Sequence, residues 1–210
     1  MQPPPPVTRA LVIATTALLF LAQIPALKLT LWTWLALAPL KSGLFWPWQV
    51  LTYAFVHVDP MQWFVNMLAV YFFGTQLEEL WGPRRYIQFM LASALTGAAA
   101  YLLLTMFFFV AAPLAGASGA VFGMLIAFAI LFPNRRILLF FVADVTMRNA
   151  VFIFIGIELF IMLGDMATSA AGWVSNVAHL GGMLGAWLMI LWWRHRPPSF
   201  KRGSTIRRVK

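Results

Sequence analysis

Six long apolar runs follow one another along the chain, separated by short polar or proline-containing gaps. A helix needs about 20 mostly apolar residues to cross roughly 30 Å of membrane hydrocarbon. The runs approach or exceed this length, and they cover residues 10–27, 61–81, 86–109, 117–133, 148–165 and 176–193. The pattern therefore predicts an all-α integral membrane protein built as a six-transmembrane-helix bundle.

Residues 28–60 separate the first two runs and do not fit a membrane-spanning helix. They are interrupted by Pro39, Lys41, Ser42, Gly43 and Pro47. The same segment holds four of the ten tryptophans, which are Trp32, Trp34, Trp46 and Trp48. Tryptophan is enriched where a membrane meets water. We therefore expect a membrane-interface loop between the first and second helices.

The first run has an alternative explanation as a cleaved signal peptide. Residues 22–26 roughly resemble the small-residue cleavage site of such a peptide. However, the run is long for a signal peptide, and its removal would leave an odd number of spans. We therefore expect it to form the first helix of the bundle.

Composition agrees with a membrane protein. The chain is 62% hydrophobic and only 10% charged, with a mean hydropathy of +0.83, whereas a soluble domain carries about a quarter charged residues. The absence of cysteine excludes disulfides and cysteine-ligated metals. The three histidines, one of them near the C-terminus, are too few for a metal centre, so we expect no metal.

The net charge of +9 could indicate a nucleic-acid partner, but the positions of the charges indicate membrane topology instead. In a six-span chain, the two ends and the second and fourth gaps share one side, which holds thirteen lysines and arginines. The other side holds only Lys28 and Lys41. Because positive residues collect in the cytoplasm, we expect both termini to be cytoplasmic, and no nucleic-acid partner.

The ends of the chain differ from its apolar middle. Residues 2–8 contain four prolines, and residues 195–210 are strongly basic. We expect a short N-terminal tail over residues 1–9, a membrane domain over 10–194, and a basic C-terminal tail over 195–210. Basic segments bind anionic lipid headgroups, so the C-terminal tail is expected to meet the lipid bilayer.

Three polar side chains share one predicted depth in the membrane. Ser118, His179 and Asn66 lie 17, 15 and 18 residues before arginines that end their runs. At 1.5 Å per residue these separations are about 25, 22 and 27 Å. The three side chains are therefore expected to converge on one level below the outer surface.

The fourth helix is expected to begin inside the membrane, because Pro113 lacks an amide hydrogen and cannot extend it smoothly. Non-helical backbone at this depth must be buried in protein or line a water-filled cavity, and hydrolysis needs such a cavity. Ser118 falls in the first helical turn, where backbone N–H groups are unpaired. Its own N–H is therefore a candidate donor to an oxyanion.

A serine becomes a useful nucleophile when a base lies within hydrogen-bond reach, and His179 is the candidate base. Gly116 and Gly119 on one helix, and small residues around Gly182 on the other, would let the two helices approach closely. No acid lies at this level in the fourth or sixth helix, so no Asp-completed triad is expected. For Glu158 in the fifth helix, a structural polar contact is favoured over the alternative, a role in catalysis.

Each of these features also has an ordinary explanation. A Gly-x-Ser-Gly sequence in a membrane helix is commonly a packing motif. A histidine in such a helix is more informative, because ionisable groups there are usually functional. The shared depth, the broken helix start and the small-residue faces together favour catalysis.

Taken together, these residues resemble the rhomboid family of intramembrane serine proteases. The resemblance rests on Gly116-Ala117-Ser118-Gly119, on Ala178-His179 followed by Gly182, and on His57 ahead of Asn66. It covers nearly the whole chain in the six-helix bacterial form, and so implies a protein of the bacterial inner membrane. It implies a Ser–His dyad, without a cofactor, that cleaves transmembrane protein substrates in or near their membrane segments.

The resemblance also assigns roles to single residues. Ser118 corresponds to the nucleophile, and His179 to the general base and acid. Asn66 corresponds to an oxyanion-hole side chain that acts with the Ser118 N–H. His57 corresponds to a histidine at the top of the second helix. Glu78, with Gly82 and Arg84 after it, resembles the cytoplasmic end of that helix.

Three positions depart from the family pattern. Gln62 replaces a histidine four residues before Asn66, and its amide is still expected to donate to the oxyanion. Gln49 after Trp48 replaces an arginine, which weakens any anchoring role of that residue. Phe122 replaces a tyrosine beside His179; it can stack on the imidazole but cannot form a hydrogen bond through a hydroxyl.

The resemblance places substrate entry between the second and fifth helices, where Phe64, Phe152 and Phe154 would line a gate or face lipid. Two other classes of protein remain as alternatives. A catalytically inactive rhomboid-like protein would bind membrane helices, but such proteins typically lack the serine or the histidine. A small transporter would show inverted repeats and more polar groups at the midplane.

Overall fold

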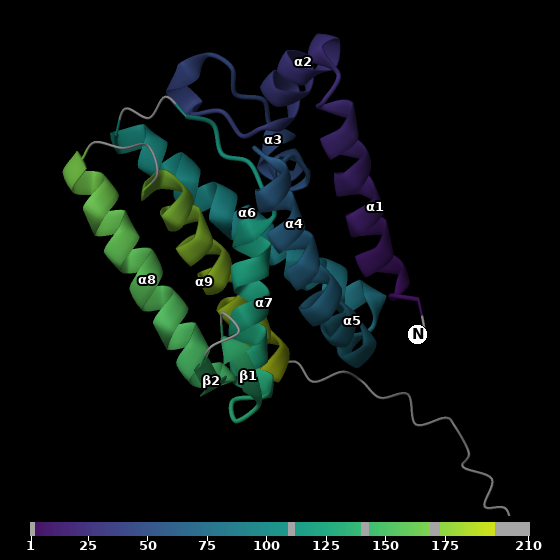
Figure 1. Ribbon diagram of the computed structural model, residues 1–210. Coiled ribbons are helices and arrows are strands. Elements are labelled where there is room, and N and C mark those ends of the chain that lie inside the picture. The colour runs from purple at the N-terminus through teal and green to yellow at the C-terminus, as the bar shows by residue number, and fades with distance from the viewer. Residues whose placement is uncertain (1–2, 109–111, 140–142, 169–172, 196–210) are drawn as a thin grey trace, which may run out of the picture.

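The computed structural model of the chain describes residues 3–108, 112–139, 143–168 and 173–195. This part of the chain is a helical bundle with one short β-hairpin at one end (Figure 1). Its helices and strands are α1 Pro6–Leu21, α2 Pro25–Leu35, α3 Gln49–Thr52, α4 Pro60–Ala69, α5 Thr75–Trp81, α6 Pro83–Phe107, α7 Ser118–Leu131, β1 Arg136–Leu139, β2 Ala143–Thr146, α8 Met147–Thr168 and α9 Trp173–His195.

Three of the described helices, α6, α8 and α9, are long and apolar enough to cross a membrane, so the chain is a multi-pass membrane protein. Helices α1 and α7 are apolar but shorter. The second predicted run is divided into α4, a π-helical turn over Val70–Gly74, and α5. Each of the six apolar runs therefore contains at least one helix, although the helices differ from the runs in length.

The expected helix over residues 10–27 was wrong at its C-terminal end. Helix α1 ends at Leu21, and Pro25 begins α2 after a short turn. Proline fits the first turn of a helix because the N–H that it lacks has no partner there. Figure 1 shows α2 turned away from the axis of α1.

The expected N-terminal tail over residues 1–9 was also wrong, because α1 begins at Pro6 and Thr8 is fully buried. The buried carboxylate of Glu78 accepts hydrogen bonds from Val7 N at 2.9 Å, Thr8 N at 2.7 Å and Thr8 Oγ1 at 2.8 Å. The first N–H groups of a helix have no partner within it and carry partial positive charge. Glu78 therefore caps α1 from α5. The expected tail over 195–210 lies outside the described residues, apart from His195.

A strictly all-α fold was not found. Strands β1 and β2 form an antiparallel pair between α7 and α8, in which Arg136 lies opposite Thr146 and Leu139 opposite Ala143. Arg136 Nε donates to Asp144 Oδ2 at 2.8 Å. The sequence did not indicate strands here, because each has only four residues and the flanking runs are strongly helical.

The segment between α1 and α4 forms no span, as expected, but it is well organised. Trp34, Trp46 and Trp48 form an exposed stack with ring centroids 5.1–5.7 Å apart. Gln49 is fully buried and uses both ends of its amide. It accepts from Ala38 N and Trp46 N at 3.1 Å and donates to Thr33 O and Leu44 O at 2.9 and 3.2 Å. Gln49, which stands where the family has an arginine, therefore holds this loop together through its amide.

Helices α7 and α9 approach each other through small residues, as the sequence predicted, and α9 approaches α6 in the same way. A Cβ added at Gly182 of α9 would collide with the backbone carbonyl of Gly119 on α7. A Cβ added at Gly185 would collide with the Thr96 side chain of α6. The absence of side chains at these positions lets α9 lie directly against two neighbouring helices.

We predict that Glu78→Ala will destabilise the protein, because three hydrogen bonds to a buried carboxylate are lost. Hydrogen bonds to charged groups contribute about 1.5–3 kcal/mol each before compensation, so we expect a loss of at least about 2 kcal/mol in the free energy of unfolding. Thermal unfolding in detergent measures the effect. The exposed neighbour Glu79 provides the control, and equal stability of the Glu78→Ala and Glu79→Ala variants would contradict the capping role.

We predict that Gly182→Ala will also destabilise the protein, by at least about 1–3 kcal/mol, because its methyl group would force α7 and α9 apart. The matched control is Gly156→Ala on α8, where an added Cβ meets no atom within 4 Å. Unfolding of both variants in the same detergent makes the comparison. Similar stability of the two variants would show that the glycine contact is not required.

Candidate active site

Ser118 is the first residue of α7, and the chain before it is not helical. Gly116 has φ +119°, a backbone conformation that favours glycine, and a Cβ there would meet Gln62 Nε2 at 2.8 Å. This bend places Ser118 at the start of the helix, where its side chain is half-buried. The N–H groups of Ser118 and the next two residues have no intrahelical acceptor, as at any helix N-terminus.

The loop before Ser118 is buried in protein, which is one of the two conditions expected for non-helical backbone at this depth. Its backbone groups bond to five residues from elsewhere in the chain. Tyr101 Oη donates to Ala112 O; Leu37 exchanges two bonds with Leu114; Gln62 Nε2 donates to Ala115 O; Gly116 N donates to Tyr53 O; and Ala117 N donates to His57 Nε2. The segment between α1 and α4 therefore shapes the serine loop.

The structure brings Ser118 and His179 together. The distance from His179 Nε2 to Ser118 Oγ is 2.7 Å, across the close contact between α7 and α9. An imidazole with a free Nε2 lone pair accepts the hydroxyl proton in this arrangement. The pair therefore has the geometry of a nucleophile and its base.

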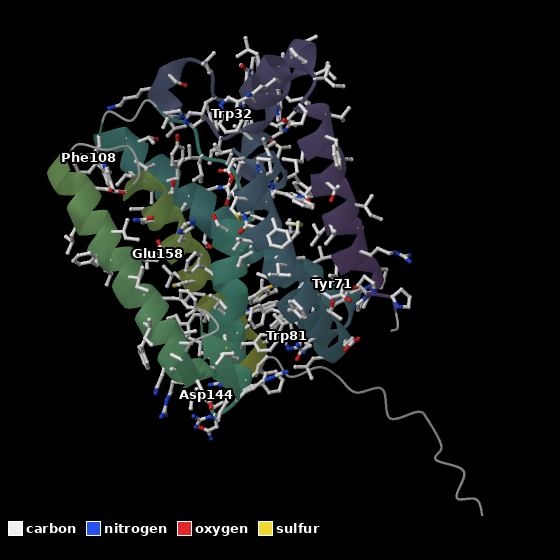
Figure 2. All side chains as sticks on the ribbon, viewed as in Figure 1. Trp32, Tyr71, Trp81, Phe108, Asp144 and Glu158 are labelled. Atoms are coloured by element: carbon white, nitrogen blue, oxygen red, sulfur yellow. The ribbon has the colours of Figure 1, made fainter. Side chains whose placement is uncertain are left out.

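No Asp-completed triad was expected, because the helices of the serine and the histidine hold no acid at this level, but the structure places an acid from α8 beside His179. Glu158 Oε2 lies 2.9 Å from His179 Nδ1, and the Glu158 side chain is buried. Figure 2 shows Glu158 midway along α8, on the side that faces the interior of the bundle. The acid comes from a third helix, whereas the helices that carry the serine and the histidine hold no acid at this depth. A lone acid in an apolar helix was the available signal.

Phe122 packs on the imidazole ring, and Phe154 packs on Phe122. Phe122 stacks on His179 with centroids 4.6 Å apart and an interplanar angle of 21°, as the sequence predicted for this phenylalanine. Phe154 of α8 meets the edge of Phe122 at 6.2 Å. The other two proposed gate residues, Phe64 and Phe152, are exposed on α4 and α8.

Asn66 of α4 supplies an unused donor. Its side chain is buried, and its Nδ2 has no hydrogen-bond partner among the described residues. A buried donor without a partner costs free energy unless a ligand or water satisfies it. This state fits the predicted role of Asn66 in holding an oxyanion, for which donors must be preorganised.

Gln62 is engaged with the backbone on both sides of its amide. Its Oε1 accepts from Val58 N at 2.8 Å, while its Nε2 donates to Ala115 O at 3.2 Å. These bonds join the start of α4 to the serine loop. Gln62 therefore holds the serine loop against the start of α4, in addition to its predicted role as a donor to the oxyanion.

His57 lies in the loop before α4 and is buried against the serine loop. Its Nε2 is 3.5 Å from Ala117 N. Burial lowers the pKa of His57 to about 4, because the charged ring would lose its hydration. The ring is therefore neutral at pH 7 and can accept the Ala117 N–H.

A separate cavity of 340 Å³ lies beside the N-terminus of α7. Its lining is almost entirely apolar and includes Leu11, Met67, Val70, Ala117 and Ala120, but neither Ser118 nor His179. This cavity is therefore not the water-filled cavity that was predicted beside Ser118.

Comparison with known proteins adds to this geometry. A family model described as the Rhomboid domain matches residues 45–196. Rhomboid protease GluP of Bacillus subtilis is 30% identical over 139 residues, which cover 66% of this chain and 24% of that protein. Rhomboid protein 1, mitochondrial, of Saccharomyces cerevisiae is 34% identical over 143 residues, covering 62% of this chain and 37% of that protein.

RHOMBOID-like protein 12, mitochondrial, of Arabidopsis thaliana is 30% identical over 167 residues, which cover 72% of this chain and 47% of that protein. The chain therefore spans between about a quarter and about half of the length of these three relatives. The region matched by the family model contains all of the site residues described above.

Proposed function

The chain belongs to the rhomboid family, and from this premise we propose that it is a serine endopeptidase of the membrane. Its substrates are other membrane proteins, cleaved in or near their transmembrane segments. The observation that carries the proposal is the 2.7 Å contact between Ser118 Oγ and His179 Nε2 within a bundle of apolar helices.

The reaction follows from the positions of these two side chains. As Ser118 Oγ attacks the scissile carbonyl carbon, its proton passes to His179 Nε2. The Ser118 N–H and Asn66 Nδ2 donate to the oxyanion that forms. His179 then gives the proton to the leaving amine, which breaks the peptide bond and leaves an ester on Ser118. Water, deprotonated by His179, hydrolyses this ester.

We further propose six spans with both termini in the cytoplasm of a bacterial cell, and an active site reached from the outer side. Supporting this topology, the start of α1, the end of α5, the β-hairpin and the end of α9 lie at one end of the bundle (Figure 1). The arginines gather at these points: Arg9, Arg84, Arg85, Arg135, Arg136, Arg148 and Arg194. This is the distribution that the positive-inside rule predicts.

A fluorophosphonate probe tests the proposed chemistry on the full chain in detergent. We expect the probe to label the wild-type protein, and we expect Ser118→Ala and His179→Ala to lose labelling and peptide cleavage by at least about 1,000-fold. Ser175→Ala, at an exposed serine of α9, is the matched control and should behave as wild type.

The substrates for this test are membrane proteins whose transmembrane helices are destabilised by glycine or proline. If the wild-type protein is neither labelled nor able to cleave them, the protease proposal fails. Retained binding of the same substrates would then support the alternative, a catalytically inactive rhomboid-like protein that binds membrane helices.

The two amides near the serine allow a sharper prediction. We expect Asn66→Ala to lower kcat by about 100- to 1,000-fold, the usual effect of removing one oxyanion donor. Gln62→Ala should lower it by about tenfold or less, because the Gln62 amide is already bonded to Val58 and Ala115. Equal and large losses in both variants would show that both amides hold the oxyanion.

A further inference from the structure

Helix α8 reaches the histidine of the site directly through Glu158, and indirectly through Phe154 one turn earlier. Glu158 meets His179 Nδ1 directly, and Phe154 meets the phenylalanine that stacks on the imidazole. We infer that Glu158 is a positioning residue of the reaction, which makes the site a Ser118–His179–Glu158 triad. This inference rests on the proposed function and concerns the same site.

The contacts of the imidazole determine where its proton lies. With the Glu158 carboxylate 2.9 Å from Nδ1, the neutral ring carries its proton on Nδ1 and donates it to Oε2. The lone pair of Nε2 then points at Ser118 Oγ, 2.7 Å away. Glu158 therefore selects the tautomer that can accept the serine proton, as a carboxylate does in a serine-protease triad.

The carboxylate is itself held in place. Asn176 is buried on α9, and its amide, oriented so that both ends are satisfied, donates to Glu158 Oε2 at 3.2 Å and accepts from Met162 N at 3.2 Å. A single amide thus links the acid to the helix that carries the histidine. This link fixes the carboxylate between α8 and α9, so that it cannot turn away towards lipid.

Among the described residues, Glu158 is the acid that lies within ion-pair distance of His179. Helix α7 presents Ser118 and Phe122 to the ring. Helix α6 packs on α9 near His179 through Gly97 and Ala100, while its arginines lie at its other end. On α8, Arg148 and Asp165 lie ten and seven residues from Glu158. The imidazolium formed during catalysis therefore depends on Glu158 for its compensating charge.

The chemical consequence is stabilisation of that imidazolium. A positive ring in a mostly buried site is unfavourable unless an opposite charge lies beside it. Both side chains of the pair are largely buried, with 15% and 11% of their surface exposed for His179 and Glu158. A purely structural contact between helices would not require a charge here, since an amide could make the same hydrogen bond.

The test compares wild type with Glu158→Gln, which keeps the shape of the side chain but removes its charge. We expect kcat/KM at pH 7 to fall by about 100-fold or more. We also expect the acid limb of the pH–rate profile to move to lower pH by about one pH unit or more, because the imidazolium loses its counter-charge. Glu158→Asp should recover part of the activity, and Glu79→Gln, at an exposed site, is the control.

A structural role alone predicts a different result. It would leave the acid limb of the pH–rate profile in place, whether or not the unfolding temperature changes. If Glu158→Gln is folded, retains kcat/KM within about threefold and keeps the wild-type profile, the inference is overturned. Failure of the wild-type protein to cleave or to be labelled would instead overturn the proposed protease function.

Proton NMR of the detergent-solubilised protein tests the contact without turnover. We expect a strongly downfield Nδ1–H resonance in wild type, assigned by its loss in His179→Ala, and a clear upfield shift in Glu158→Gln. Absence of this resonance from an active wild-type protein would overturn the inference while leaving the protease proposal intact.

Discussion

The close approach of α7 and α9 is the constraint on which the site depends. Gly182 leaves no room for a side chain against the Gly119 carbonyl, and the serine and histidine lie one residue and three residues from this contact. If larger residues separated the helices by even about an ångström, the 2.7 Å hydrogen bond would be lost. Glycine is therefore needed here for helix packing and for catalytic geometry together.

A second constraint comes from the backbone. A helix that begins inside a membrane leaves N–H and C=O groups that lipid cannot satisfy. In this protein, backbone N–H and C=O groups of the loop before Ser118 form hydrogen bonds with side chains and backbone of residues 37–62 and with the Tyr101 hydroxyl. Because the loop ends at Ser118, the first N–H groups of α7, including that of Ser118, have no acceptor within the helix. The segment between α1 and α4 thus contributes to the site without supplying the nucleophile or the base.

Helix positions and the Ser118–His179 contact could be predicted from apolar runs and residue depth, whereas the Phe122 stack was implied by the family resemblance. Prediction from the sequence failed where a contact joins distant segments. The capping of α1 by Glu78 and the four hydrogen bonds of Gln49 depend on tertiary placement. The sequence singled out Glu158 for a polar contact but did not identify His179 as its partner, because periodicity does not state which face of α8 meets α9.

The placement of the acid has a physical consequence for the site. A carboxylate within an apolar helix is costly unless it is paired, and Glu158 gains its pairing from His179 and Asn176 on the neighbouring helix. Helix α8 is also the least buried of the three long helices. In its most apolar stretch 22% is buried, against 39% in α6 and 44% in α9. The polar contacts of Glu158 with His179 and Asn176 therefore tie α8 to α9 in addition to apolar packing. The same contacts orient the base, so the position of α8 and the readiness of Ser118 for attack are coupled.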